Sequence, residues 1–179
     1  MNRRGLITAL PATLLARSAF GQTVTVPPGS QTIFFSGTSV GNGADTTEDT
    51  LQSFTIPTGT FTNVGDTLHI LCAGTLGATT DSRSVRVKLA TQLVPAVTAT
   101  TAAQVKWVTE TWVTKTGSST QTSWMSGFLT GGSMSGNMSI TTALTDTAPI
   151  AFVVTGQNNT NPTAGSITCQ YVLIEWLRA

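Results

Sequence analysis

The chain has 179 residues, a charged fraction of 9% and a formal net charge of +1. This length predicts one domain of ordinary size, and the nine lysines and arginines are too scattered for a nucleic-acid surface. The polar residues are mainly Thr, Ser, Asn and Gly, which favour strands and turns and predict an all-β protein. An uncharged polar surface is easily desolvated and suits subunit contacts, although an exported β-protein would have the same composition.

The first 21 residues resemble a targeting segment. Arg3 and Arg4 precede an apolar run over residues 5–16, and small residues follow it, which is the arrangement of a twin-arginine export signal with its cleavage site. The alternative is a retained apolar arm that a partner subunit covers, since short apolar N-termini resemble signals. The run is too short to cross a bilayer, so we expect no stable membrane span.

A connector containing Pro and Gly separates this segment from the rest of the chain. It covers residues 22–30 and includes Pro27 and Pro28, which disfavour a helix and keep the backbone extended. We therefore predict two parts. Residues 1–30 are an N-terminal arm or export signal with its connector, and residues 31–179 are a single antiparallel β-sandwich.

The first half of this domain alternates apolar runs of strand length with segments of turn-forming residues. Strands are predicted at residues 31–36, 51–56, 67–73 and 85–89. In the last of these, Val85, Val87 and Leu89 alternate with polar residues, which predicts one buried and one solvated face. The turn residues of 57–66 indicate that the strands on either side belong to one sheet, as in a meander or the front half of a sandwich.

Two groups of residues in this half have chemical potential. Asp45, Glu48 and Asp49 are numerous enough to bind a hard cation, but they lack calcium-loop spacing, and turn or edge residues that bond backbone donors are the simpler interpretation. His69 has no nucleophile motif beside it. We therefore predict that it is a strand-face residue that makes a hydrogen bond.

The two cysteines, Cys72 and Cys169, both lie in apolar runs. A disulfide between the two halves of the sandwich is one interpretation, and two buried reduced thiols are the commoner alternative. The sequence has no CxxC motif, and His69 is its single histidine, so a Cys/His zinc site is not predicted.

The middle of the chain contains an Ala/Thr-rich stretch and then a long strand. Residues 90–104 include Pro95, and we predict a long loop or an irregular edge segment there. Residues 105–116 form a strand with Trp107 and Trp112 on opposite faces. One tryptophan is then expected in the core and the other under a neighbouring subunit or loop, unless the monomer covers both faces itself.

The last third of the chain continues the pattern of strands. Strands are predicted at residues 120–130, 133–142, 150–155 and 166–177. The first two make further hairpins, and the final strand is expected to pair centrally in its sheet.

Four stretches of the sequence together suggest a family. They are GNGADTTEDTLQSFTIPTGTFTNVGDTLHI, RSVRVKL, ETWVTKTGSSTQ and VTGQNNTNPTAGSITCQYVLIEWL. Over about residues 31–177 the chain resembles a β-sandwich module of virion surface proteins in tailed bacteriophages and prophages. The resemblance implies a jelly-roll-like sandwich, commonly trimeric, with no enzymatic activity and no cofactor. A fibrous shaft is missing, so a head decoration fits as well as a fibre tip.

We expect a non-enzymatic virion structural protein that self-associates, with a homotrimer favoured, and that attaches to other virion proteins through residues 1–30. Catalytic residues, cofactor-binding residues and metal ligands are not predicted, and nucleic acid is not expected as a partner. The alternative is an exported, extracellular carbohydrate-binding or adhesive module, whose partner is a host-surface glycan stacked on Trp112, Trp124 or Trp176. A hydrolase would need two carboxylates facing one cleft. The candidates are Glu110 and Glu175, for which a hydrogen-bonded glutamate is the simpler interpretation.

Overall fold

The computed structural model describes residues 29–90, 92–101, 103–130, 132–133, 139–142, 144 and 147–179. The predicted arm or export signal and most of its connector, residues 1–28, lie outside the described residues. Every regular element in the described part of the chain is a strand. No described segment forms a helix of the length and hydropathy needed to span a bilayer.

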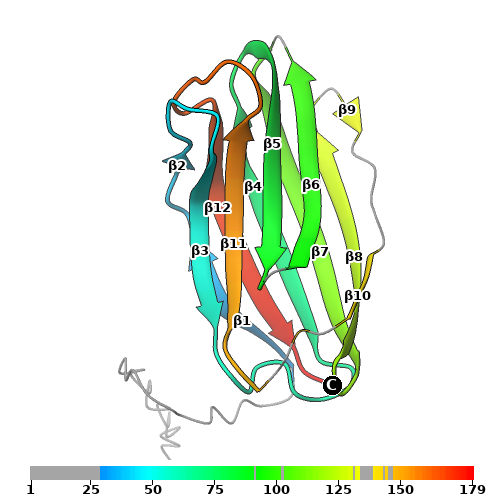
Figure 1. The fold of residues 1–179 in the computed structure, drawn as a ribbon. Helices are drawn as coiled ribbons and strands as arrows, with labels where there is room; N and C mark the ends of the chain where they lie inside the picture. Colours follow the sequence, from blue (N-terminus) through cyan, green and yellow to red (C-terminus); the bar gives the residue numbers. More distant parts are fainter. Residues whose placement is uncertain are drawn as a thin grey trace, which may run out of the picture.

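The strands form two antiparallel sheets packed face to face (Figure 1). In chain order they are β1 (Ser30–Ser36), β2 (Val40–Gly41), β3 (Glu48–Ile56), β4 (Thr67–Leu76), β5 (Thr79–Leu89), β6 (Gln92–Thr101), β7 (Val105–Gly117), β8 (Thr120–Leu129), β9 (Gly132–Ser133), β10 (Ser139–Thr142), β11 (Ile150–Asn158) and β12 (Ile167–Leu177). The larger sheet has the order β1-β12-β4-β7-β8-β10, with β2 beside β12 and β9 beside β8. The smaller sheet has the order β3-β11-β5-β6.

The strand pairs are nested, which defines the topology. The hairpin of β5 and β6 is the innermost pair, and the pairs β4–β7, β3–β11 and β1–β12 follow outward, alternating between the two sheets. A long double ribbon rolled around one core gives this order, and it is the arrangement of a jelly roll. The predicted all-β, jelly-roll-like sandwich is therefore confirmed. Strands β8 and β10 lie outside the nested scheme and extend the larger sheet beyond β7.

Of the two alternatives for this half of the chain, the meander is wrong and the front half of a sandwich is correct. The runs 51–56, 67–73 and 85–89 lie in β3, β4 and β5, which alternate between the sheets, so the segment 57–66 crosses between sheets instead of joining neighbours in one. Turn residues show where the chain reverses but not which sheet receives the next strand. Buried Asp66 holds this crossing, because its carboxylate accepts the backbone N–H groups of Thr62 at 3.0 Å and Asn63 at 2.7 Å.

The segment 90–104 is not a loop. Its residues Gln92–Thr101 form β6 at the edge of the smaller sheet, so the edge alternative is correct. The register against β5 shifts between Ala96 and Val94, which leaves Pro95 at an irregularity where its missing N–H interrupts no regular ladder. The central pairing predicted for the last strand is confirmed, since β12 lies between β1 and β4.

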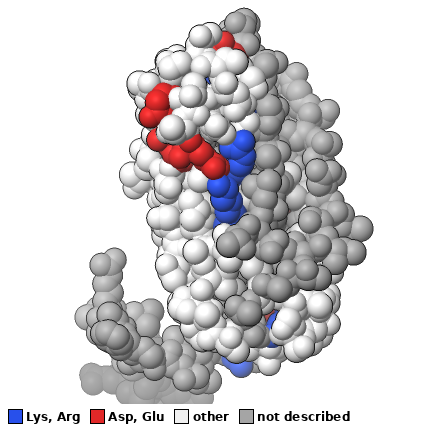
Figure 2. Space-filling model, in the orientation of Figure 1, with Lys and Arg blue, Asp and Glu red and all other residues white. Residues whose placement is uncertain are grey.

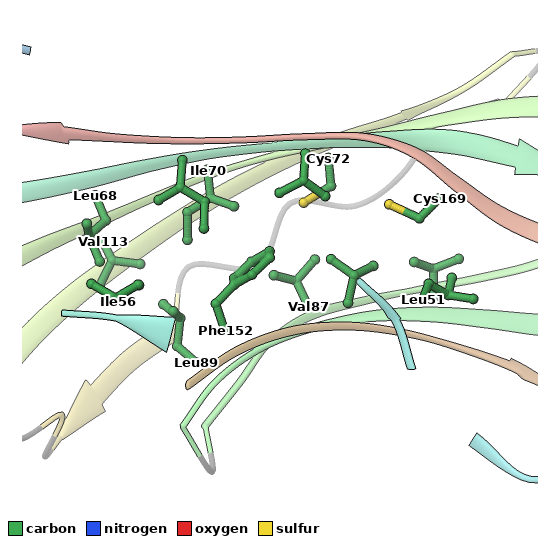
Figure 3. Packing of buried hydrophobic residues seen from close by; sticks show 14 of the residues in the cluster. Leu51, Ile56, Leu68, Ile70, Cys72, Val87, Leu89, Val113, Phe152 and Cys169 are labelled. Carbon is green, nitrogen blue, oxygen red and sulfur yellow. The ribbon is translucent and has the colours of Figure 1, made fainter. Parts of the chain in front are cut away.

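The core fills the space between the sheets. Figure 3 shows Leu68 and Ile70 of β4 pointing toward Phe152 of β11 and Val87 of β5, and all four are almost fully buried. The alternation predicted for 85–89 is confirmed, because its apolar side chains are buried and the side chains of Arg86 and Lys88 point outward. Burial of this cluster supplies the main stabilisation of the sandwich.

The two cysteines belong to the same core. Cys72 and Cys169 are buried and are not joined in a disulfide, as the alternative of two reduced thiols predicts. Burial raises the pKa of both thiols, that of Cys169 to about 11, because the charged thiolate is poorly solvated there. Both thiols therefore stay protonated near neutral pH, which makes them poor nucleophiles.

The tryptophans of β7 divide between the two faces, as predicted. Trp107 is fully buried, and its indole N–H donates to the Thr168 carbonyl at 3.1 Å. Gly74 lies beside it, and a Cβ at this glycine would come within 1.8 Å of the same carbonyl oxygen. The backbones of β4 and β12 can approach this closely only because no side chain stands at that position.

Candidate functional site

The outer face of the smaller sheet carries a network of charged and polar side chains that satisfy each other. Glu48 of β3 accepts hydrogen bonds from Lys88 at 2.8 Å, from Arg86 at 3.4 Å and from Thr155. Arg86 also donates to Gln157 at 2.8 Å. Figure 2 shows this side of the molecule, with a stripe of basic residues next to a group of acidic ones.

This network sets the ionisation of Glu48. Partial burial acts to raise the pKa of Glu48, but the hydrogen bonds from Lys88 and Thr155 and the positive charges of Lys88 and Arg86 hold the pKa below its ordinary value. The carboxylate is therefore fully engaged with groups of its own sheet. Among the described side chains of this face, Glu48, Arg86 and Lys88 therefore satisfy each other.

The acidic segment before β3 has structural contacts. Asp45 accepts hydrogen bonds from the backbone and hydroxyl groups of Thr47, which lower its pKa, and Asp49 accepts the backbone N–H of Gly43 at 2.9 Å. These are the turn contacts expected of Asx residues. The described residues contain no group of three or more His, Cys, Asp or Glu side chains arranged for a metal ion.

The outer face of the larger sheet is different, and one row of residues across it brings together four of the candidate residues. The register pairs Glu175 of β12 with His69 of β4, His69 with Trp112 of β7, and Trp112 with Trp124 of β8. Glu110 lies on the same face of β7, two residues before Trp112. We call these five residues the aromatic row.

His69 connects the two glutamates of the aromatic row. Its Nδ1 lies 2.8 Å from Glu175 Oε2 and its Nε2 lies 2.9 Å from Glu110 Oε1. Its ring also stacks on Trp112, with centroids 4.0 Å apart and an interplanar angle of 22°. The three contacts fix the imidazole, and through it they fix the Trp112 indole and one oxygen of each carboxylate.

Beside the aromatic row lies a set of apolar side chains, which we call the apolar patch. It comprises Phe35, Leu71, Ala73, Val108, Phe128, Tyr171 and Leu173, placed on one face by the pairing of β1, β12, β4, β7 and β8. Phe35 is 60% exposed and Phe128 is 58% exposed, while Phe35 makes an edge contact with Tyr171 at 5.4 Å. Contiguous exposed apolar residues of this kind mark interaction surfaces.

Strand β8, which is added to the jelly roll, supplies one exposed aromatic residue to the aromatic row and one to the apolar patch. Trp124, which is 47% exposed, and Phe128 project from β8 on the outer face. The inward side chains of the same strand, such as Met125 and Gln121, are buried. The added strand therefore contributes to the core with one face and widens the outer surface with the other.

The structure decides between several predictions about these residues. The hydrogen bond predicted for His69 is confirmed, and two are present. The prediction of Trp176 as a sugar-stacking residue is wrong, because its side chain is 4% exposed and lies in the core. Glu110 and Glu175 do share a face, but both are bound to His69 on open sheet surface, with side chains 37% and 29% exposed.

The convergence of Glu110 and Glu175 on His69 does not follow from the sequence pattern. It depends on β4 lying between β7 and β12, and a single sequence does not specify which strands are neighbours. The one sequence feature that points to this site is the alternation of β4, which puts His69 on the solvated face of its strand.

Comparisons with known proteins give one distant similarity. No family model matches the sequence, and no curated protein matches it. Among solved structures, the fold is similar to the CBM2 module of the evolved Dit of Lactobacillus casei BL23 phage J-1, with a TM-score of 0.48 and 11% sequence identity. The similarity covers 86% of this chain and 99% of that chain.

Proposed function

We propose that this chain is a non-enzymatic surface component of a tailed-phage virion, a head decoration or tail ornament, and that it self-associates through the apolar patch. The observation that carries the proposal is the contrast between the two outer faces of the sandwich. On the smaller sheet, Glu48 forms ion pairs with Arg86 and Lys88. On the larger sheet, Phe35 and Phe128 are exposed within an apolar surface. An apolar core within a polar rim is the anatomy of a subunit interface.

The positions of the two phenylalanines favour a ring. Phe35 lies on β1 and Phe128 on β8, four strand spacings apart in the larger sheet, which is about 19 Å at the usual separation of strands. Two exposed apolar sites on opposite sides of one face suit a heterologous contact, in which one side of each copy meets the other side of the next. A cyclic trimer closes such a contact, and residues 1–30 would attach it to neighbouring virion proteins.

Multi-angle light scattering tests self-association. We expect a trimeric mass for the full chain and a monomeric mass for the double variant Phe35→Thr, Phe128→Thr, because the threonines remove the apolar contact area and keep strand propensity. The matched control is Val64→Thr, which changes a residue that is also exposed but lies outside the sheets and should leave the trimer intact. A monomeric wild-type protein would refute self-association.

Mass spectrometry of purified particles tests the location. Peptides of this chain should be present in phage particles at a fixed ratio to the major capsid protein. Their absence from particles of the phage that encodes the chain would refute the virion assignment, whatever the oligomeric state.

We also expect no catalytic turnover. Glu110 and Glu175 each share a hydrogen bond with the same imidazole, so neither stands as an independent acid or base over a cleft. The assay is the release of reducing sugar from a panel of polysaccharides. Hydrolysis by the wild-type protein that disappears in Glu110→Gln would overturn this expectation.

A further inference from the structure

We propose that the aromatic row is a binding site for a neutral glycan. Sugar rings would stack on Trp124 and Trp112, and the outward oxygens of Glu110 and Glu175 would accept hydrogen bonds from sugar hydroxyl groups. This site is a second activity beyond self-association, and it uses residues that the apolar patch does not contain.

The two tryptophans provide a prepared stacking surface. Trp112 and Trp124 are directly opposite across β7 and β8, where cross-strand Cβ atoms lie about 5 Å apart. The His69 ring fixes Trp112 from one side at 4.0 Å, and Trp124 is half exposed. A large aromatic ring that is already held in place, as Trp112 is, loses little conformational entropy when a ligand stacks on it.

The two carboxylates provide hydrogen-bond acceptors at the edge of this surface. Glu110 uses Oε1 and Glu175 uses Oε2 to bind His69, and no described residue hydrogen-bonds to Glu110 Oε2 or Glu175 Oε1. Sugar hydroxyl groups are donors that suit these free oxygens, and hydrogen bonds to a charged acceptor are strong. The imidazole prevents either carboxylate from turning away, so the acceptors are positioned before the ligand arrives.

The charges around the aromatic row select a neutral ligand. Two carboxylates and one imidazole face the site, and the next cation along β7 on this face is Lys106. Lys106 is four residues from Glu110, or about 13 Å at the usual rise of a strand. Uronic acids, sialic acids and phosphate-bearing polymers would meet the negative charges of these two carboxylates, which disfavours them.

The shape of the site selects a chain over a single sugar. The row crosses an open sheet face and does not enclose a ligand as a pocket for a small molecule does. An oligosaccharide lying along the row could contact Trp124 and Trp112 with successive sugar units. Affinity should therefore increase with chain length, and monosaccharides should bind weakly.

Isothermal titration calorimetry with defined oligosaccharides tests this site. The neutral probes are cellohexaose, xylohexaose, mannohexaose and maltohexaose, and the anionic probe is hexagalacturonic acid. We expect at least one neutral hexasaccharide to bind and the anionic one not to bind. Trp124→Ala should weaken that binding about tenfold or more, and Glu110→Gln should weaken it several-fold, because an amide presents a poorer acceptor.

Two controls separate this site from the proposed assembly. Ser53→Ala changes an exposed residue of β3 in the smaller sheet and should leave glycan binding unchanged. The monomeric double variant Phe35→Thr, Phe128→Thr should still bind the glycan, since the aromatic row is intact. The proposal fails if no neutral hexasaccharide binds, if the anionic probe binds equally well, or if Trp124→Ala binds like the wild type while retaining the wild-type circular dichroism spectrum.

Discussion

The two outer faces of this sandwich differ in how far their side chains satisfy each other. On the smaller sheet, Glu48 is saturated by Arg86 and Lys88. On the larger sheet, His69 hydrogen-bonds to one oxygen of each of two glutamates, and aromatic rings remain exposed nearby. The difference shows that charged groups on one face can be satisfied by their own sheet, whereas the other face combines partly satisfied carboxylates with exposed aromatic rings.

The largest effect is expected from a residue that both faces depend on. Trp107→Ala would leave a cavity in the core and remove the hydrogen bond to the Thr168 carbonyl, at a cost of about 3–5 kcal/mol. Urea unfolding monitored by circular dichroism measures the loss. Because the core positions both sheets, the variant should lose the trimer and glycan binding together. A cost below about 1 kcal/mol would show that this ring is not part of the folded core.

An intermediate effect is expected at the centre of the aromatic row. His69→Phe retains an aromatic ring against Trp112 but removes both ring nitrogens, so Glu110 and Glu175 lose their shared partner. The free energy of unfolding should fall by about 1–2 kcal/mol. If the hydrogen bonds are responsible, adding Glu175→Gln should cost less in this background than in the wild type. Equal costs in both backgrounds would contradict the coupling.

The smallest effect is expected on the outer face of the smaller sheet. Glu48→Gln weakens the ion pairs with Arg86 and Lys88, and partly exposed pairs of this kind contribute about 0–1 kcal/mol. The pKa of Glu48 is lowered in the folded protein from its ordinary value of 4.5. Its contribution is therefore present above about pH 4.5 and is lost as the pH falls through the lower folded value. Unfolding free energies at pH 7 and pH 3 should show a smaller difference between the wild type and Glu48→Gln at pH 3. A difference that grew on acidification would contradict the sign.

Local pattern was sufficient for most of the strands. The alternation of Val85, Val87 and Leu89 and the division of Trp107 and Trp112 between two faces follow from the period of two in an extended chain, and the structure confirms both. Segment 90–104 was harder to interpret, since Pro95 is equally compatible with a loop and with the edge strand that is observed.

The sequence by itself determined that the chain is all-β and that Val85, Val87 and Leu89 point inward from their strand, because these properties depend on neighbours along the chain. Only the tertiary structure decided the nested strand order, the crossing at 57–66 and the meeting of Glu110 and Glu175 at His69. It also showed that Trp176, a candidate sugar-stacking residue, lies in the core. These features depend on contacts between strands far apart in sequence, and their register is fixed by packing of the whole core rather than by any local preference.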